Sequence, residues 1–287
     1  MTRNEKLLSG IELTRARGIE IGPLATPVVR KEGSDVRYVD YADQAELRRR
    51  YAGDPNVDLA NILPVDAVWG ERTLRECFAD ERHFDYVVAS HVIEHVPDMI
   101  GWLQEIAEVL RPGGLLCLAI PDKRYTFDYL RQPTRLCELI DAWLRRNRRP
   151  MPAQLFDFNV NAVEVDLVAA WDGTLKVDAL KHYVNEQFAL DRSVDSIRDG
   201  KYVDAHCWVF TPSSLFDVLA GLARLDLLGY CFERFFPTEP YTNEFVLVLK
   251  CIGAQESTDG RRAAAHDFER LAAENRIGPA PAKAAVM

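Results

Sequence analysis

The chain of 287 residues contains no long uninterrupted apolar run, although 48% of its residues are hydrophobic. No stretch approaches the roughly 20 apolar residues that a membrane-spanning helix needs. The first residues lead into no apolar segment of the kind that a secretory signal contains. We therefore expect a cytoplasmic protein without a membrane partner. An excess of basic residues is missing too, because the formal net charge is −9. Nucleic acid is therefore not an expected partner, since neutralising its phosphates requires a dense basic surface.

Paired cysteines and a glycine-rich phosphate loop are absent as well. The six cysteines show neither a C-x-x-C pair nor zinc-like spacing, which favours buried, reduced thiols. The motif G-x-G-x-x-G, which places a pyrophosphate on a helix N-terminus, does not occur, and its absence argues against a NAD-dependent dehydrogenase. One short basic run covers residues 145–149 and ends at Pro150. We interpret this run as a solvated helix end.

Short apolar runs alternate with helical patterns over the first half of the chain. This alternation predicts parallel strands that are joined by crossover helices. The predicted strands cover residues 18–21, 36–39, 63–69, 86–89, 115–120, 230–236 and 244–251. The main predicted helices cover residues 3–17, 98–110 and 211–225.

The alternation of strands and helices is interrupted between residues 123 and 205, where mixed helical patterns occur. We predict a mostly helical insertion there, with an aromatic core of its own. The core residues would be Trp143, Phe156, Phe158, Trp171, Tyr183 and Phe188. The expected organisation is a core of residues 1–122 and 206–253, an insertion at 123–205, and a C-terminal helix with a flexible tail at 254–287.

Polar or small residues stand where the first two predicted strands end. The first strand closes in Glu20-Ile21-Gly22-Pro23-Leu24, and Asp40 closes the second, twenty positions after Glu20. Glycine lets a ligand approach the backbone closely, and a carboxylate at such a position can accept hydrogen bonds from both hydroxyls of a ribose. Ligands of open α/β sheets bind at the carboxyl ends of the strands. The two strand ends therefore predict a nucleoside site.

A longer motif follows at the fourth predicted strand. It reads Phe84-Asp85-Tyr86-Val87-Val88-Ala89-Ser90-His91-Val92-Ile93-Glu94-His95-Val96-Pro97-Asp98, and the next helix closes in Val109-Leu110-Arg111-Pro112-Gly113-Gly114. With these motifs, residues 17–122 resemble the class I S-adenosylmethionine-dependent methyltransferases of the type 11 group, and residues 206–251 resemble them more weakly. The resemblance implies an α/β, Rossmann-like, doubly wound sheet of seven strands, whose last strand runs antiparallel between its neighbours.

The resemblance also assigns eight residues to the cofactor, S-adenosylmethionine. They are Glu20 and Gly22 beside the methionine part, with Pro23 in the same loop, Asp40 at the ribose, Trp69 and Gly70 at the adenine, and Ser90 and His91 under the sulfonium. The family usually carries E-x-G-x-G-x-G in this loop, whereas only the first of those glycines is present here.

The expected reaction is methylation of an oxygen or nitrogen atom of a small molecule. The protein must hold the nucleophile close to the methyl carbon and, for a hydroxyl, remove its proton. His91 is our first candidate for this base or for orienting the acceptor, followed by His206 and then His182.

The acceptor site is expected after the fifth strand, where Lys123, Arg124 and Tyr125 follow its carboxyl end. The two cations suit an acceptor that bears a carboxylate or a phosphate. The insertion would then form a lid over this site.

His91, Glu94 and His95 also match H-x-x-E-H, a metal-binding signature of some zinc proteases. Pro97 breaks any long helix at this point, which argues against a protease. Some quinone-pathway O-methyltransferases hold a divalent ion with a similar E-x-x-E-H turn, in which the first residue is a glutamate rather than a histidine. We expect Glu94 and His95 to stabilise the turn and the reaction to need no metal. If a divalent metal is bound, these three residues are its expected ligands.

Two other functions remain open at this point. The altered glycine loop is compatible with a lyase or cyclase that attacks another carbon of the sulfonium. A non-catalytic, methyltransferase-like partner subunit is the second alternative. The sequence does not decide whether the chain forms a homodimer.

Overall fold

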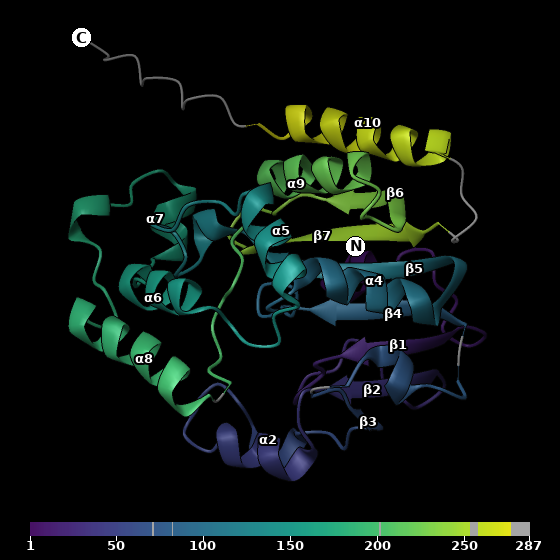
Figure 1. Cartoon of the computed structure of the whole chain (residues 1–287), viewed down its shortest axis with the longest axis horizontal. Coiled ribbons are helices and arrows are strands. Elements are labelled where there is room, and N and C mark those ends of the chain that lie inside the picture. The colour runs from purple at the N-terminus through teal and green to yellow at the C-terminus, as the bar shows by residue number, and fades with distance from the viewer. Residues whose placement is uncertain (71, 82, 201, 253–257, 277–287) are drawn as a thin grey trace.

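A seven-stranded sheet forms the centre of the computed structural model, which describes residues 1–70, 72–81, 83–200, 202–252 and 258–276 (Figure 1). The strands are β1 (Arg17–Ile21), β2 (Asp35–Asp40), β3 (Ala67–Val68), β4 (Phe84–Ser90), β5 (Leu110–Pro121), β6 (Tyr230–Phe236) and β7 (Glu244–Cys251). Their order across the sheet is β3-β2-β1-β4-β5-β7-β6. The first five run parallel, and β7 is antiparallel to both β5 and β6. The predicted fold is thereby confirmed.

The helices surround this sheet, and three short 3-10 segments lie in the connections. The helices are α1 (Arg3–Leu7), α2 (Gln44–Arg50), α3 (Leu74–Cys77), α4 (Met99–Val109), α5 (Leu136–Arg145), α6 (Pro152–Asn161), α7 (Leu167–Trp171), α8 (Glu186–Asp199), α9 (Pro212–Arg224) and α10 (Thr258–Glu274). The 3-10 segments are η1 (Leu59–Asn61), η2 (Lys123–Tyr125) and η3 (Val177–Ala179).

Local capping explains where helices α4 and α9 begin. The side chain of Asp98 accepts a hydrogen bond from the backbone N–H of Gly101 at the start of α4. The side chain of Thr211 does the same for Ser214 at the start of α9, where Pro212 occupies the first turn. Both patterns are favoured N-caps, and both predicted helices are confirmed to within about one residue at each end.

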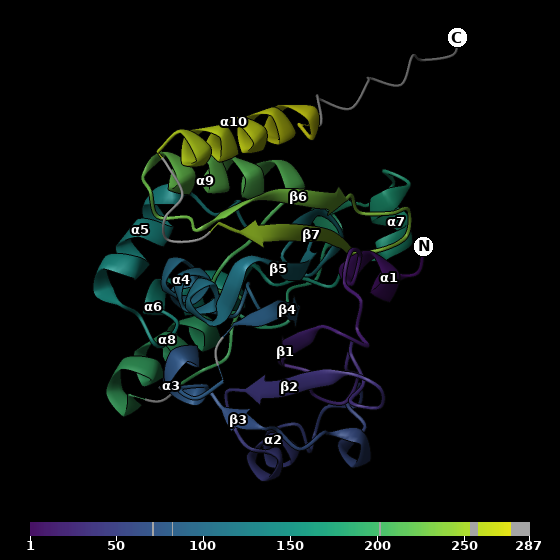
Figure 2. The same cartoon turned by 90° about the vertical axis from the view of Figure 1, so that its right-hand side faces the viewer.

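The two faces of the sheet are covered differently. One face packs against α3, α4, α9 and α10, with Trp102 and Phe216 in its core (Figure 2). The other packs against α1 and the connection between β1 and β2, with Leu7, Val28 and Val29 in its core. Residues 22–34 of that connection contain no helix. A ligand at the end of β1 therefore meets a loop rather than a helix N-terminus.

The predicted helix at residues 3–17 is wrong in length. Helix α1 ends at Leu7, and Gly10 follows with a φ of +89°. This left-handed conformation is one that glycine adopts readily and that a right-handed helix excludes. The predicted third strand was also too long, since only Ala67 and Val68 pair with β2.

The insertion at residues 123–205 is mostly helical, and its helices α6, α7 and α8 lie beyond the ends toward which β1 and β4 point (Figure 1). The predicted aromatic core of the insertion is wrong for several members. Phe156, Tyr183 and Phe188 are 37%, 59% and 46% exposed, and Trp143 packs against the core of the sheet. These side chains cover other elements or face solvent, so they form no core of their own.

The C-terminal helix α10 packs along α9 at the edge of the molecule (Figure 2). The flexible tail that we predicted from Gly278 lies outside the described residues. Within the described part of the chain, no helix combines the length and the apolar character that crossing a membrane requires.

Candidate active site

The carboxyl ends of β1, β2 and β4 open into one large cavity of about 1190 Å³, which we call the main cavity. Of the residues predicted to bind the cofactor, all eight line it. They are Glu20, Gly22, Pro23, Asp40, Trp69, Gly70, Ser90 and His91. The cavity exceeds the usual size range of small-molecule sites, about 300–1,000 Å³, so it has room for two ligands side by side.

Glu20 and Gly22 shape the cavity where β1 ends. The carboxylate of Glu20 accepts hydrogen bonds from the backbone N–H groups of Val28 and Val29 at 2.6 and 2.8 Å. Burial raises the pKa of Glu20 to about 7, although these two bonds oppose the shift. Glu20 thus holds the connection between β1 and β2 in place. Gly22 has a φ of +68°, and a Cβ there would lie 3.0 Å from the side chain of Val92. A side chain at this position would therefore be strained and would press against Val92 in the wall of the cavity.

Asp40 lies at the end of β2 and is 5% exposed. Its Oδ1 accepts a hydrogen bond from the backbone N–H of Tyr41 at 2.7 Å. Burial raises the pKa of Asp40 to about 6, and that hydrogen bond opposes the shift. Trp69 and Gly70 lie nearby at the end of β3, and the Trp69 indole N–H donates to Glu105 at 3.2 Å. Burying a carboxylate without partners is energetically costly, so hydroxyl donors that enter the cavity would stabilise Asp40.

Two residues that the sequence did not predict lie beside Ser90 and His91: Arg3, which lines the main cavity, and Glu244, which pairs with both Arg3 and His91. The Arg3 guanidinium donates to Ser90 Oγ at 2.5 Å and to both carboxylate oxygens of Glu244 at 2.5 and 2.9 Å. His91 Nε2 lies 2.7 Å from Glu244 Oε2. Burial alone would raise the pKa of Glu244, but its bonds to His91 and Arg3 outweigh burial and lower the pKa to about 2. His91 also has a φ of +53°, a left-handed conformation that is uncommon for histidine and occurs at functional sites.

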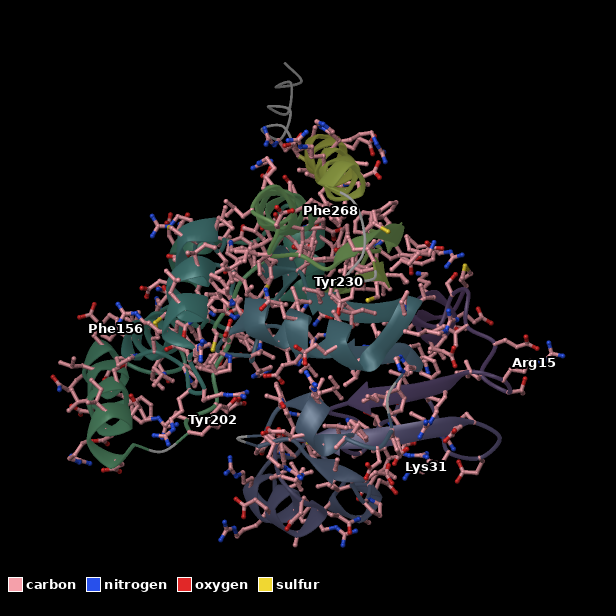
Figure 3. All side chains as sticks on the ribbon, turned by 45° about the vertical axis from the view of Figure 1, so that its right-hand side comes forward. Arg15, Lys31, Phe156, Tyr202, Tyr230 and Phe268 are labelled. Atoms are coloured by element: carbon pink, nitrogen blue, oxygen red, sulfur yellow. The ribbon has the colours of Figure 1, made fainter. Side chains whose placement is uncertain are left out.

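The insertion reaches the opposite wall of the main cavity through Tyr202. Its ring stacks on Tyr41 with a centroid distance of 6.0 Å and an interplanar angle of 26°. Figure 3 shows Tyr202 on the side of the insertion that faces helix α2 and the neighbouring edge of the sheet. The Arg50 guanidinium lies 4.9 Å from the Tyr41 ring centroid. Core and insertion therefore meet directly next to Asp40.

The basic run at residues 145–149 is confirmed as a helix end, but it does more than face solvent. Arg146 adopts a φ of +53° and ends α5. The chain then turns so that Arg146, Arg148 and Arg149 line the main cavity. Arg148 also forms an ion pair with Glu105 at 3.3 Å. Arg145, by contrast, pairs back along its own helix, with Asp141 at 2.9 Å.

The residues predicted to bind the acceptor do not line the main cavity. Lys123 Nζ donates to the carbonyl of Tyr129, and Arg124 pairs with Asp122. Tyr125 stacks on Trp171, with 4.1 Å between ring centroids.

The other two candidate bases lie outside the main cavity as well. His182 is exposed, and its Nδ1 lies 2.8 Å from the carbonyl oxygen of Val160. His206 is buried, with Nδ1 2.6 Å from Asp128 Oδ2. Of the three histidines, the structure brings only His91 to the predicted cofactor residues.

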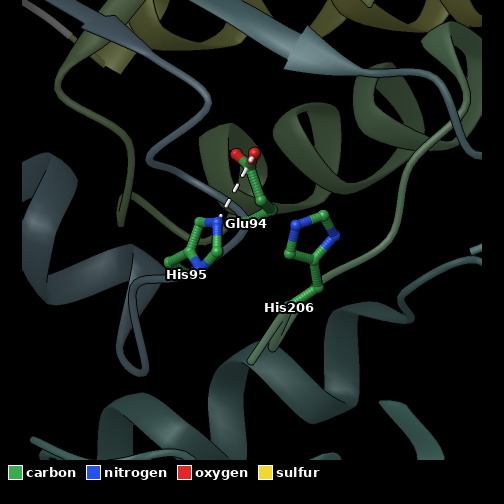
Figure 4. Close-up of side chains that lie close together, drawn as sticks. All are labelled: Glu94, His95 and His206. Atoms are coloured by element: carbon green, nitrogen blue, oxygen red, sulfur yellow. Dashed lines mark ion pairs between the residues drawn. The ribbon is translucent and has the colours of Figure 1, made fainter. Parts of the chain in front are cut away.

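The predicted metal ligands are only partly brought together. Glu94, His95 and His206 form a cluster whose potential ligand atoms all lie within 4.8 Å of one another (Figure 4). His91 is not part of this group, and His206 occupies the third position instead. One carboxylate and two imidazoles are a donor set that suits a divalent transition metal.

Comparison with known proteins gives three kinds of matches. A family model described as a methyltransferase domain matches residues 6–221. The ubiquinone biosynthesis O-methyltransferase of Methylocella silvestris is 32% identical over 114 residues, which cover 39% of this chain and 40% of that protein. The match thus spans well under half of the relative's length. The solved CcbJ methyltransferase from Streptomyces caelestis is 14% identical, with 86% of this chain and 94% of that chain covered and a TM-score of 0.43. An S-adenosylmethionine-dependent methyltransferase from Mesorhizobium loti is 15% identical, with coverages of 82% and 90% and a TM-score of 0.36.

Proposed function

The chain belongs to the methyltransferase-domain family, as its motifs predicted, and from this premise we propose that it methylates an anionic small molecule with S-adenosylmethionine as the donor. The observation that carries the proposal is the main cavity, in which Gly22, Asp40 and His91 meet at the ends of three adjacent strands. When bound, the cofactor supplies an activated methyl group, and the residues of the chain position the reactants.

The cavity has a suitable group for each end of the cofactor. Asp40 is a buried acceptor for the two ribose hydroxyls, and its carboxylate can accept both bonds when it is ionised. Arg3 is a cation beside Ser90 and suits the carboxylate of the methionine part. Gly22 lines the cavity without a side chain, which lets a ligand approach the backbone closely.

His91 is the proposed base. It borders the main cavity, while the charged Glu244 holds Nε2 at 2.7 Å. A carboxylate on one ring nitrogen fixes the orientation of the imidazole, as a general base requires. His91 Nδ1 is then the nitrogen for the acceptor hydroxyl or ammonium. The name of the Methylocella silvestris relative, an O-methyltransferase, supports oxygen as the acceptor atom.

The acceptor is proposed to carry a carboxylate or phosphate that pairs with Arg146 and Arg148. Both arginines line the main cavity, and a guanidinium binds such groups through two parallel hydrogen bonds. Arg124 was expected in this role, but it does not line the main cavity and pairs with Asp122 instead. The insertion, which contributes Tyr202 to the cavity wall, would cover the two ligands and exclude water.

Incubation of the purified chain with S-adenosylmethionine and a panel of hydroxylated carboxylates and phosphates tests this function. We expect S-adenosylhomocysteine and an acceptor heavier by one methyl group, detected by mass spectrometry. Methylthioadenosine as the product would instead indicate the lyase or cyclase alternative. If calorimetry detects no binding of S-adenosylmethionine or S-adenosylhomocysteine, the non-catalytic alternative is correct and the proposal is wrong.

A further inference from the structure

Glu94 has a buried carboxylate without a hydrogen-bond partner. Its side chain is 2% exposed, and among the described residues neither carboxylate oxygen has a hydrogen-bond partner. Two ring nitrogens, His91 Nδ1 and His95 Nε2, lie 3.6 and 4.0 Å from Oε1, which is beyond hydrogen-bond distance. A buried charged group normally has a partner or coordinates a metal, because its removal from water is costly. Glu94 therefore indicates a missing partner in the space that its oxygens face.

Two imidazoles border that space, and a carboxylate orients each of them. His95 Nδ1 lies 3.0 Å from Asp204 Oδ1, and His206 Nδ1 lies 2.6 Å from Asp128 Oδ2. When each ring is neutral and donates its Nδ1 hydrogen to the carboxylate, its Nε2 is free to donate an electron pair to a metal. Metal-bound histidines show this arrangement, in which a second group fixes the ring and its tautomer.

The two orienting carboxylates keep their charge in this setting. Partial desolvation would raise the pKa of Asp204, but the hydrogen bond to His95 outweighs this effect and lowers the pKa to about 2. Asp128 also has a lowered pKa despite its burial, because His206 and Arg131 both pair with it. The Arg131 guanidinium donates to Asp128 Oδ1 at 2.8 Å. The two carboxylates that orient the histidines are therefore paired, whereas the carboxylate of Glu94 has no hydrogen-bond partner among the described residues.

We propose that Glu94, His95 and His206 bind one divalent transition-metal ion, of the zinc or cobalt type. Two imidazoles and one carboxylate favour these ions over magnesium, which prefers an all-oxygen environment. The ligand atoms lie within 4.8 Å of one another. Metal bonds of about 2.0–2.2 Å would draw them somewhat closer together.

His91 is not a ligand in this proposal. Glu244 holds its Nε2 at 2.7 Å, and its Nδ1 lies 3.6 Å from Glu94 Oε1. His206 takes the third place although it lies 111 positions after His95 in the sequence. The metal site therefore goes beyond the proposed methyl transfer and does not depend on it.

The position of these ligands gives the ion a structural task. Glu94 and His95 lie in the turn after β4, while Asp128 and His206 lie near the two ends of the insertion. The backbone N–H of Cys207 also donates to the carbonyl of Glu94 at 2.6 Å. A bound ion would thus fasten both ends of the insertion to the turn beside the main cavity.

Metal titration of the full chain tests the proposal. After treatment with EDTA and gel filtration, the chain is titrated with zinc sulfate and, separately, with cobalt chloride. We expect one ion per chain by elemental analysis, a micromolar or tighter dissociation constant, and the visible absorption of cobalt in a low-symmetry site. We also expect the metal-loaded chain to melt at a higher temperature than the metal-free chain.

Variants locate the site. H206Q should weaken zinc binding by about 100-fold or more, whereas H91Q and the exposed control H182Q should leave it within about twofold. D204N keeps all three ligands and should weaken binding by about 10–100-fold, the usual effect of losing the group that orients a ligand. Because Asp204 is half exposed, this variant keeps the test informative if H206Q does not fold.

Three outcomes would overturn the proposal. One is the absence of stoichiometric binding in the unmodified chain, which would leave Glu94 balanced by a proton on His95. A second is loss of binding in H91Q but not in H206Q, which would return the site to the H-x-x-E-H turn alone. The third is equal binding in the unmodified chain and D204N.

Discussion

His91 Nε2 lies 2.7 Å from Glu244 Oε2, although the two residues are 153 positions apart in the sequence. Glu244 is the first residue of β7, and β7 runs antiparallel to β5. The start of β7 therefore lies at the same edge of the sheet as the ends of the parallel strands, where His91 follows β4. This pairing gives the proposed base a fixed orientation.

Replacement of His91 by Asn should lower kcat by about 10²–10⁴, the usual contribution of a general base. The affinity for S-adenosylhomocysteine should change by no more than a few-fold, and the pH–rate profile should lose its acidic limb. E244Q should reduce kcat less, because it removes the charge and keeps the shape. If H91N retains near-normal kcat, His91 is not the base; if it loses cofactor binding, His91 belongs to the cofactor pocket.

Cofactor binding should weaken as the pH falls below 6. Asp40 accepts ribose hydroxyls through its ionised form, and burial raises its pKa to about 6 in the free protein. Below that pH a proton must leave before the ribose binds, so affinity should fall by up to about tenfold for each pH unit. Calorimetry with S-adenosylhomocysteine between pH 5 and 8 measures this slope.

Variants of Asp40 provide the control for that pH dependence. D40A should weaken binding at pH 7.5 by about 1.5–3 kcal/mol, the value of hydrogen bonds to a charged group. D40N should bind weakly with little dependence on pH in the same range. An unchanged slope in D40N would assign the titration to another group.

Substitution of Gly22 by Val should abolish cofactor binding through steric conflict. The left-handed φ of +68° disfavours a β-branched residue, and a Cβ would meet Val92 at 3.0 Å. Gly33 also has a positive φ, of +84°, but a Cβ at that position would meet no described atom within 4 Å outside its chain neighbours. G33V is therefore the matched control: it carries backbone strain away from the cavity, and it should bind S-adenosylhomocysteine as the unmodified chain does.

The arginines of the α5 end should bind an anion. In the presence of S-adenosylhomocysteine, we expect inorganic pyrophosphate to bind the unmodified chain, and R146A and R148A each to weaken that binding about tenfold or more. R145A is the control, because Arg145 pairs with Asp141 outside the cavity. Equal weakening in all three variants would indicate a general charge effect and not a site.

The cofactor side of the cavity was predictable because its residues are local to strand ends. Glu20, Gly22 and Asp40 follow from where two apolar strands stop, and the parallel sheet then brings these ends together. The contacts that Glu20 makes could not be predicted from the sequence. Its contacts with Val28 and Val29 depend on the path of a loop without helical periodicity.

The rest of the main cavity and its surroundings were less predictable because distant segments supply them. Arg3 appears in the sequence as an ordinary residue of a surface helix, and Tyr202 as part of a loop. Glu244 did carry a signal. A last strand that runs antiparallel must start at the edge of the sheet where the parallel strands end. Its first polar residue was therefore a candidate for contact with the site at that edge. The arginines of α5 reach the cavity only because Arg146 turns the chain, and sequence patterns do not reveal this turn.

The place of β7 between β5 and β6 has a consequence for synthesis of the chain. Strand β6 leaves the ribosome before β7, yet β7 is its neighbour in the sheet. Until residue 251 has been made, β6 has no strand beside which to pair, whereas β1 to β5 can already assemble. A nascent chain stopped before Glu244 would therefore expose two unpaired edges, those of β5 and β6, and would lack the carboxylate that orients His91. Arrested chains of increasing length should become resistant to protease in two steps, the second only after β7 has emerged.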